Sequence, residues 1–543
     1  MIEKVKKNLL NVSNLLFSFI FACFYGLAYW MSKKVLAVAT GESTYQNIDL
    51  LKIQASDSLC IFLGFIIGLV IYFVFFILLT NYPLHEEKKW NPKRLFLVSF
   101  LMSFLGGGLQ LLVLNPGCVM SDSIIIINGA LGMRAQHPLV YILYLAGIVR
   151  GVANITGSIS VAMFVFSLVQ LSLCSLIIAY VISWLAQKGV KKIWIIILAG
   201  YYSLFPMIGN YNITAIKDTV FGYFLVLVTI SFYEIMTTKG DWLKDKKNIV
   251  LFVISFLGLS VVRNNGVYVC IVLLAILIFA LPKCYKKMIC IFTIVFFIIN
   301  TGISKTSNSM PMESLAIPIQ QTALTIVKSD DVTDEQKEIV SNMLPYKEWE
   351  LHYLPFAVDT IKWDPSVNKD WLNSNNDVFV KNWLEMMPQN FKYYVEAFLY
   401  QTCGLWNTDL VACDSAVNYG QSRFVPDYLY TYTSTMTGET SQVTHAQILP
   451  VKVEQFLNNI YSKANFLGGG QCFWLMLVLC CVALAKKNFK TIWGILPTLG
   501  VVGTLFLSTP LSLAFRYTFF YVLVLPIMLL LLNINIVQES RDL

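Results

Sequence analysis

Charged residues are scarce in this 543-residue chain: Asp, Glu, Lys and Arg make up 13% of it, whereas hydrophobic residues make up 57%. The mean hydropathy is +0.64. In an ordinary soluble domain about 25% of residues are charged. The composition therefore excludes a typical soluble globular protein and predicts a protein that is embedded in a lipid bilayer.

Metal-binding motifs are also missing. The chain has four histidines and twelve cysteines, but no C-x-x-C pair and no H-E-x-x-H motif, so a dedicated zinc site is not expected. The glycine triplets at 106–108 and 468–470 lie in apolar segments, where small residues indicate close helix packing and not a phosphate loop. Cys403 and Cys413 fall in a polar region, where their spacing fits either a disulfide or two free thiols.

Long hydrophobic runs, in contrast, recur along the whole chain, and many could cross a bilayer core of roughly 30 Å. We expect an all-α polytopic membrane protein without a cleavable signal peptide, since no small-residue cleavage site follows the first run. About twelve transmembrane helices are expected, at 9–31, 59–80, 95–114, 158–184, 193–209, 217–236, 248–262, 266–282, 288–304, 466–485, 491–508 and 517–535.

The apolar segment 139–153 is ambiguous, and the placement of Lys and Arg decides it, because cytoplasmic loops are enriched in these residues. If 139–153 does not cross, the loops assigned to the cytoplasm hold 21 Lys and Arg residues and the short outer loops hold 8. If it crossed, every later basic cluster would face outward. We therefore expect 139–153 to lie in or dip into the outer interface, with both termini cytoplasmic.

One long polar insert, residues 305–464, interrupts the spans. It holds 11 of the 40 Lys and Arg residues and 19 of the 32 Asp and Glu residues, for a net charge of −8. Because the whole chain carries +8, the remainder carries +16, which is a topology signal and no sign of nucleic-acid binding. By the same rule the insert is extracytoplasmic, and its apolar periodicity predicts a mostly helical domain. The chain then divides into a transmembrane region at 1–304 with an outer loop at 115–157, the insert at 305–464, and C-terminal transmembrane helices at 465–543.

Polar residues gather at those ends of the expected spans that face outward. An ionisable group at the bilayer centre costs roughly 2.5–3.5 kcal/mol and less near the interface, so interfacial anchoring explains any one of them. Two acids and three cations at one leaflet, beneath a large outer domain, favour a functional site instead. The residues are, in chain order, Asp122 and Ser123, Lys217 and Asp218, Arg263 and Asn264, and Arg516 and Tyr517.

The stretch "SDSIIIINGALGMRAQHPLVY" (121–141) places an acid before an interfacial helix that begins at His137–Pro138. This arrangement resembles the first outer loop of the GT-C class of membrane glycosyltransferases, which use polyprenyl-phosphate sugars. Related transferases often have two adjacent acids here, whereas Asp122 stands alone, so a divalent cation is only weakly implied. The resemblance is closest to a multispan branch from Gram-positive bacteria, through "AIKDTVF" (215–221), "ESLAIPIQQTA" (313–323), "LPYKEWELHYLPFAVDTIKW" (344–363) and "FRYTFFYVLVLPIML" (515–529).

The resemblance implies an inverting glycosyltransferase on the outer face of a bacterial plasma membrane, with a polyprenyl-phosphate-linked sugar as donor and a cell-envelope glycan, lipid or protein as acceptor. The acceptor hydroxyl needs a base, for which Asp122 is the first candidate and Asp218 the second. The leaving phosphate needs positive charge, which Arg263, Lys217 and Arg516 could supply. No organic cofactor is expected. Candidate positioning or acceptor-binding residues are His137, Ser123, Asn264, Tyr517, Glu313, Gln320, Gln321 and Trp406.

Two other functions fit parts of the pattern. A transporter or lipid-linked glycan flippase is compatible with about twelve spans, although its charges would be expected near the midplane and its halves to be related. A polymerase or ligase of lipid-linked glycans would use similar chemistry with an oligosaccharide donor. The clustering of charge at one leaflet favours the transferase.

Overall fold

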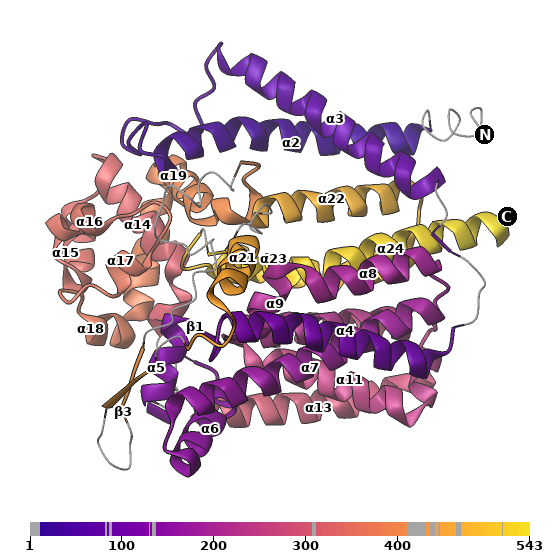
Figure 1. Ribbon diagram of the computed structural model, residues 1–543. Helices are drawn as coiled ribbons and strands as arrows, with labels where there is room; N and C mark the ends of the chain where they lie inside the picture. Colours follow the sequence, from indigo (N-terminus) through magenta and orange to yellow (C-terminus); the bar gives the residue numbers. More distant parts are fainter. Residues whose placement is uncertain are drawn as a thin grey trace.

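The protein is almost entirely helical (Figure 1). The computed structural model describes residues 11–81, 84–85, 90–129, 131–132, 137–306, 311–409, 430–433, 440–443, 446–462, 468–512 and 514–542. The helices before the insert are α2 (Val12–Ala39), α3 (Asp57–Asn81), α4 (Pro92–Val113), α5 (Ser121–Gly129), α6 (Leu139–Thr156), α7 (Ile159–Gln187), α8 (Lys192–Leu204), α9 (Pro206–Asn212), α10 (Lys217–Thr237), α11 (Lys246–Val262), α12 (Asn264–Ala280) and α13 (Lys283–Thr306).

The second half of the chain contains the insert and the last three long helices. The insert holds α14 (Ala316–Lys328), α15 (Asp334–Met343), α16 (Tyr346–His352), α17 (Asp359–Lys362), α18 (Lys369–Ser374), α19 (Asn376–Trp406), the antiparallel strands β3 (Tyr430–Thr433) and β4 (Thr440–Val443), and α21 (Val451–Ser462). After it come α22 (Gly469–Ala485), α23 (Phe489–Ser508), the 3-10 turn η4 (Phe515–Thr518) and α24 (Phe520–Asp542).

Nine helices in the described part of the chain are long and apolar enough to cross a membrane, and the bent pair α8–α9 would be a tenth. This confirms the predicted class, a helical multi-pass membrane protein; the number twelve stays a prediction. The predicted twelve leave out α6, which is one of these nine, and require α8–α9, α11, α12 and α22 to cross. Helices α11, α12 and α22 have 17 residues each, or about 26 Å at 1.5 Å per residue. Helices α10 and α24 are the most deeply buried of the long helices, whereas α3 and α13 lie at the periphery.

Helix α6 contains the ambiguous segment 139–153. It is long and apolar enough to qualify as a span, yet Figure 1 shows it beside α5, at the end of the bundle that carries α14–α19. Arg150, in its second half, donates hydrogen bonds to the carbonyl oxygens of Ile127 and Asn128 in α5. Arg150 thereby caps the last turn of α5, and these hydrogen bonds hold α6 beside α5 at that end of the molecule.

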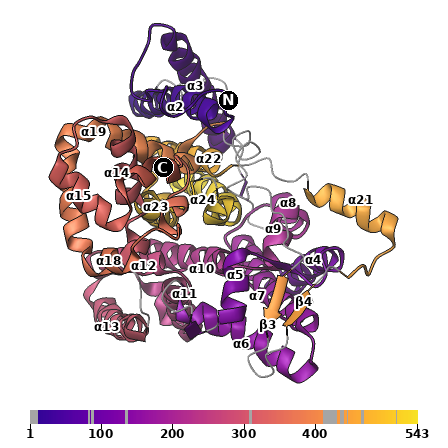
Figure 2. The ribbon, with the colours of Figure 1, turned by 90° about the vertical axis from the view of Figure 1, so that its left-hand side faces the viewer.

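The insert has a hydrophobic core of its own, separate from that of the transmembrane bundle. It is formed by apolar side chains of α14–α19, among them the fully buried Trp349, Leu372 and Phe379. A domain of this size can bury enough apolar surface for a distinct core. Figures 1 and 2 show these helices gathered at one end of the bundle.

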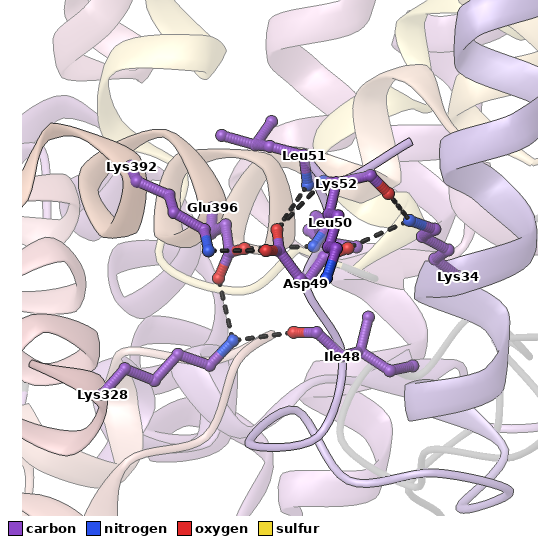
Figure 3. Close-up of polar contacts among 9 residues, drawn as sticks. All are labelled: Lys34, Ile48, Asp49, Leu50, Leu51, Lys52, Lys328, Lys392 and Glu396. Atoms are coloured by element: carbon purple, nitrogen blue, oxygen red, sulfur yellow. Dashed lines mark hydrogen bonds and ion pairs between the residues drawn. The ribbon is translucent and has the colours of Figure 1, made fainter. Parts of the chain in front are cut away.

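A cluster of charges fastens the insert to the loop between α2 and α3 (Figure 3). Glu396 of α19 is fully buried; its carboxylate lies 2.8 Å from Lys328 Nζ of α14 and accepts a hydrogen bond of 3.0 Å from the backbone N–H of Leu50. Lys328 also donates to the carbonyl oxygen of Ile48 at 2.8 Å. At the edge of the cluster, Lys392 Nζ lies 2.5 Å from the Asp49 carboxylate. Two helices of the insert, α14 and α19, therefore hold the loop.

Replacing Glu396 should destabilise this junction strongly. In the Glu396→Gln variant the buried Lys328 ammonium keeps its charge and loses its counter-ion, and breaking a buried pair in this way costs about 3–5 kcal/mol. Lys392→Met is the matched control, because its ion pair is solvent-exposed and worth at most about 1 kcal/mol. Thermal unfolding of the purified protein checks this. Equal unfolding temperatures for the two variants would contradict the proposed role of Glu396 in holding the loop to the insert.

The topology prediction can be tested with cysteine labelling in intact cells. Lys381 in the insert and Lys244 just before α11 are both exposed. In a background with Cys413 replaced by alanine, a membrane-impermeant thiol reagent should modify Lys381→Cys and spare Lys244→Cys, because the basic loops are expected to be cytoplasmic. Cys284 is an exposed natural residue at the start of α13 and should also be spared. The reverse pattern would place Asp122 on the cytoplasmic side and exclude an outer site.

Candidate active site at one end of the bundle

Two short strands align the two aspartates. Strands β1 (Cys118–Val119) and β2 (Thr214–Ala215) are parallel, with Val119 opposite Ala215. Helix α5 begins two residues after β1 and α10 begins two residues after β2, so each aspartate is the second residue of its helix. Asp122 and Asp218 therefore occupy equivalent positions in adjacent helices. An acid in the first turn is also favoured by the helix dipole.

Helix α7 holds these strands in place inside the bundle. Its Gln170 Nε2 donates hydrogen bonds to three backbone carbonyl groups between residues 211 and 214, the shortest of 2.7 Å to Thr214. Ser167 Oγ donates to the carbonyl oxygen of Ile213 at 3.1 Å. Gly117, just before β1, has a φ of +118°, and a Cβ there would lie 2.0 Å from Ser167 Oγ. Only glycine fits this position, where the backbone turns towards Asp122.

Asp122 lies between two cations. Its Oδ2 is 3.0 Å from Arg516 Nη1 and 3.7 Å from Lys217 Nζ. Burial opposes ionisation of this carboxyl group, but Arg516 and Lys217 outweigh that effect and hold the pKa of Asp122 well below its usual range. The side chain is nevertheless 25% exposed. An ionised carboxylate is thus kept in reach of an incoming molecule.

Asp218 has a different environment. Its side chain is 1% exposed, and Oδ1 lies 2.7 Å from Arg263 Nη1. The Arg263 guanidinium carbon lies 4.8 Å from the centre of the Tyr517 ring, and the Arg516 guanidinium carbon lies 4.9 Å from the same centre. Arg516 Nη2 also lies 3.0 Å from the Tyr517 hydroxyl. Tyr517 therefore holds two guanidinium groups together, although like charges repel each other.

His137 contacts the same cluster. Lys217 Nζ lies 3.0 Å from His137 Nδ1, and because an ammonium group can only donate, Nδ1 is the acceptor. Burial and the neighbouring Lys217 lower the pKa of His137 to about 4. The imidazole is therefore neutral at pH 7 and fixes the direction of the Lys217 ammonium.

The insert approaches the site through a backbone pairing with the loop before η4. Val358 N–H donates to Pro510 O at 3.1 Å, and Ser512 N–H donates to Phe356 O at 2.9 Å. Helix α17 begins directly after Val358, and Arg516 follows four residues after Ser512. The insert and the last span thus meet at the site.

Helix α17 brings in an acid that the sequence did not single out. Asp359 is largely buried, and burial together with Glu313 and Asp122 raises its pKa, although Lys362 and Arg516 act in the opposite direction. The Lys362 ammonium is almost fully buried and lies 2.9 Å from the Glu313 carboxylate. Asp359 and Lys362 lie in "AVDTIKW", within one of the sequence blocks that carry the family resemblance. Membership of that block was the sequence signal that could have identified them.

The other predicted positions lie around this cluster or away from it. Ser123 is buried and bonds to the Ala215 carbonyl oxygen at 2.5 Å, which ties α5 to β2. Asn264 is exposed at the start of α12, next to Arg263. Gln320 and Gln321 are buried and donate to carbonyl groups inside the insert. Trp406 is buried in the main core, with 7% of the residue exposed.

Two further predictions concern cysteine and metal. Cys403 is buried with its Sγ 3.1 Å from Ser512 Oγ, and Cys413 lies outside the described residues. Among the residues that the structure describes, no three His, Cys, Asp or Glu side chains converge as a metal site would need. The oxygens of Asp122 and Asp218 face Lys217, Arg263 and Arg516, whose positive charges oppose a divalent cation there.

A protein-family model, described as "Family of unknown function (DUF6020)", matches residues 129–542 of the chain. This range contains His137, Lys217, Asp218, Arg263, Arg516 and Tyr517 and ends within α24, but it begins after Asp122. No curated protein and no solved structure matches the chain.

Proposed function

The chain belongs to the DUF6020 family, and we propose that it is an inverting GT-C-type glycosyltransferase of about twelve spans in a bacterial plasma membrane. Both termini are proposed to be cytoplasmic, and the insert at 305–464 extracytoplasmic. The protein would move a sugar from a polyprenyl-phosphate carrier to a cell-envelope acceptor. The observation that carries the proposal is a partly exposed carboxylate, Asp122, held between two cations where the apolar bundle meets a polar domain.

Asp122 suits the role of base better than Asp218 does. A general base must come within hydrogen-bonding distance of the acceptor hydroxyl. The Asp122 side chain is open to a substrate, whereas the Asp218 carboxylate is enclosed and paired with Arg263. We assign Asp122 as the base and Asp218 as the residue that positions Arg263.

The cations suit a donor with a single phosphate. Lys217, Arg263 and Arg516 carry three positive charges, Asp122 and Asp218 carry two negative charges, and His137 is neutral. These six groups, without Asp359, Lys362 and Glu313 of the insert, have a net charge of +1, which the one negative charge of a sugar-phosphate-prenyl diester would balance. The two guanidinium groups on Tyr517 offer planar donor pairs of the kind that bind phosphate oxygens.

The reaction that follows from these assignments is a single displacement. The acceptor oxygen attacks the anomeric carbon as Asp122 takes its proton, a bond from the anomeric carbon to the acceptor forms, and the bond to the phosphate oxygen breaks. The prenyl phosphate leaves with a second negative charge, which Arg263, Arg516 and Lys217 stabilise. As the donor phosphate draws Arg516 and Lys217 towards itself, their hold on Asp122 weakens and the pKa of Asp122 rises. Binding of the donor would thereby strengthen the base.

The acceptor would arrive from the insert. Asp359, Lys362 and Glu313 come from the insert, and the Glu313 side chain is 37% exposed, so its carboxylate could pair with sugar hydroxyls. The carrier lipid would arrive from the bilayer, along the apolar helices.

Analysis of cell-envelope glycans in a strain with and without the gene tests this function. The proposal predicts the loss of one defined sugar substituent, restored by the wild-type gene and not by Asp122→Asn. Unchanged glycans would exclude the transferase. Loss of a whole polymer with accumulation of its lipid-linked form would indicate a polymerase or flippase instead.

A further inference from the structure

Helix α21 lies outside the helical bundle and exposes most of its apolar side chains. Figure 2 shows it projecting beyond α8 and α9, and Figure 1 shows it nearly end-on while α4 and α7 are seen from the side. Its axis is therefore roughly perpendicular to the spans. The helix contacts the bundle at α9 and α4, and Leu457 packs against a hydrophobic cluster that includes Leu111 and Leu114 of the α4 end.

The residues of α21 divide into three faces. Leu457 faces the protein. Val453, Phe456 and Ile460, at positions i, i+3 and i+7, form an apolar stripe that is 45%, 65% and 44% exposed. Lys452, Gln455 and Asn458 are exposed on the remaining side, where Val451 at the start of the helix is the one exposed apolar residue. Such a helix has one side against the bundle, one apolar side and one polar side.

The apolar stripe is continuous with the surface that the spans present to lipid. Leu105 and Leu109 of α4 and Leu204 of α8 are exposed near the same end of the bundle. A helix at right angles to the spans, at the level where their apolar surface ends, meets the boundary between acyl chains and headgroups. We propose that α21 lies in the outer leaflet with Val453, Phe456 and Ile460 inserted among the lipids.

The attraction of α21 to the bilayer would be hydrophobic and not electrostatic. The only charged residues of α21 are Lys452 and Glu454, so the helix carries no net charge. Binding through anionic headgroups needs a cluster of basic residues, which α21 lacks. Insertion should therefore be equal in neutral and anionic bilayers.

Adjacent residues provide a matched pair of probes. Phe456→Cys lies on the apolar stripe and Gln455→Cys on the polar face, and both side chains are exposed, so neither substitution disturbs the core. Each variant would carry a nitroxide label in the full-length protein, reconstituted into phosphatidylcholine vesicles with or without phosphatidylglycerol. Accessibility to oxygen and to a water-soluble nickel complex is then measured. Both variants would be made in a protein in which the five cysteines that are not buried, together with Cys413, are replaced by alanine. The five are Cys23, Cys60, Cys284, Cys290 and Cys481.

The label at 456 should be relaxed mainly by oxygen and the label at 455 mainly by nickel, in both lipid mixtures. Equal nickel accessibility at the two positions would place α21 in water and overturn the proposal. Shielding of position 456 from both reagents would indicate coverage by protein, for instance a second copy of the chain. A pattern that requires phosphatidylglycerol would show that charge, and not apolar insertion, holds the helix.

Discussion

Asp122→Asn should leave a folded protein whose sugar transfer falls by roughly 10²–10⁴-fold, the usual contribution of a general base. The amide is nearly the same size as the carboxylate and can still accept a hydrogen bond from Arg516, but it cannot take the acceptor's proton. Transfer by the purified variant, with thermal stability measured in parallel, checks this expectation.

His137→Ala is the matched control. Its imidazole orients Lys217 without reaching Asp122 by any hydrogen bond that the described residues make, so its loss should reduce transfer less and leave the pH profile of the reaction unchanged. If Asp122→Asn is folded and transfers sugar at a near-normal rate, the base lies elsewhere. Asp359 and Asp218 would then be the next residues to replace.

Arg516→Lys and Arg263→Lys should each raise the donor concentration needed for half-maximal rate by roughly 10- to 100-fold, since a hydrogen bond to a charged group contributes about 1.5–3 kcal/mol. Lysine keeps the positive charge but loses the planar pair of donors that fits a phosphate, and it stacks less well on Tyr517. Steady-state rates over a range of donor concentrations, in detergent or vesicles, measure the effect.

Arg150→Lys is the control for this pair, because Arg150 lies at the same end of the bundle and donates only to carbonyl groups of α5 in the interactions that the structure describes. For Arg150→Lys, the donor concentration that gives half the maximal rate should match that of the wild type once differences in stability are taken into account. If all three variants behave alike, or if the two cluster variants lose rate equally at low and saturating donor, then Arg263 and Arg516 do not bind the donor.

The gathering of the charged cluster could be predicted from the sequence because it depends on simple rules. Apolar runs set where spans end, and Lys and Arg placement sets which end faces outward, so Asp122, Lys217, Asp218, Arg263 and Arg516 could be assigned to one side of the membrane. The structure brings all five together around Tyr517.

The pairing within the cluster could not be predicted. Asp122 and Arg516 are 394 residues apart, and their contact depends on the register of β1 and β2 and on how α24 packs against α10. Sequence gave no reason for Arg263 to pair with Asp218 and leave Asp122 to Arg516. Which acid pairs with which arginine depends on how the helices pack, and the hydropathy pattern contains no information on that packing.

Polar residues in the insert were equally hard to assign. Gln320 and Gln321 satisfy buried carbonyl groups, whereas Asp359, which was not singled out, lies near Asp122 and Arg516. A polar side chain on a helix can face a core or a site, and only its neighbours decide between them. The same is true of Trp406, whose indole is covered by the main core.

The most direct test of the proposed function is transfer by the purified protein in vesicles. Undecaprenyl phosphate bearing radiolabelled glucose, mannose, galactose or arabinose would be supplied in turn, with envelope extract as acceptor. We expect that with one of these donors the label moves from the carrier lipid to an acceptor in the extract, that undecaprenyl phosphate is released, and that Asp122→Asn lowers both rates by roughly 10²–10⁴-fold. Label that stays on the lipid with every donor, or that crosses the bilayer with its lipid linkage intact, would contradict the account.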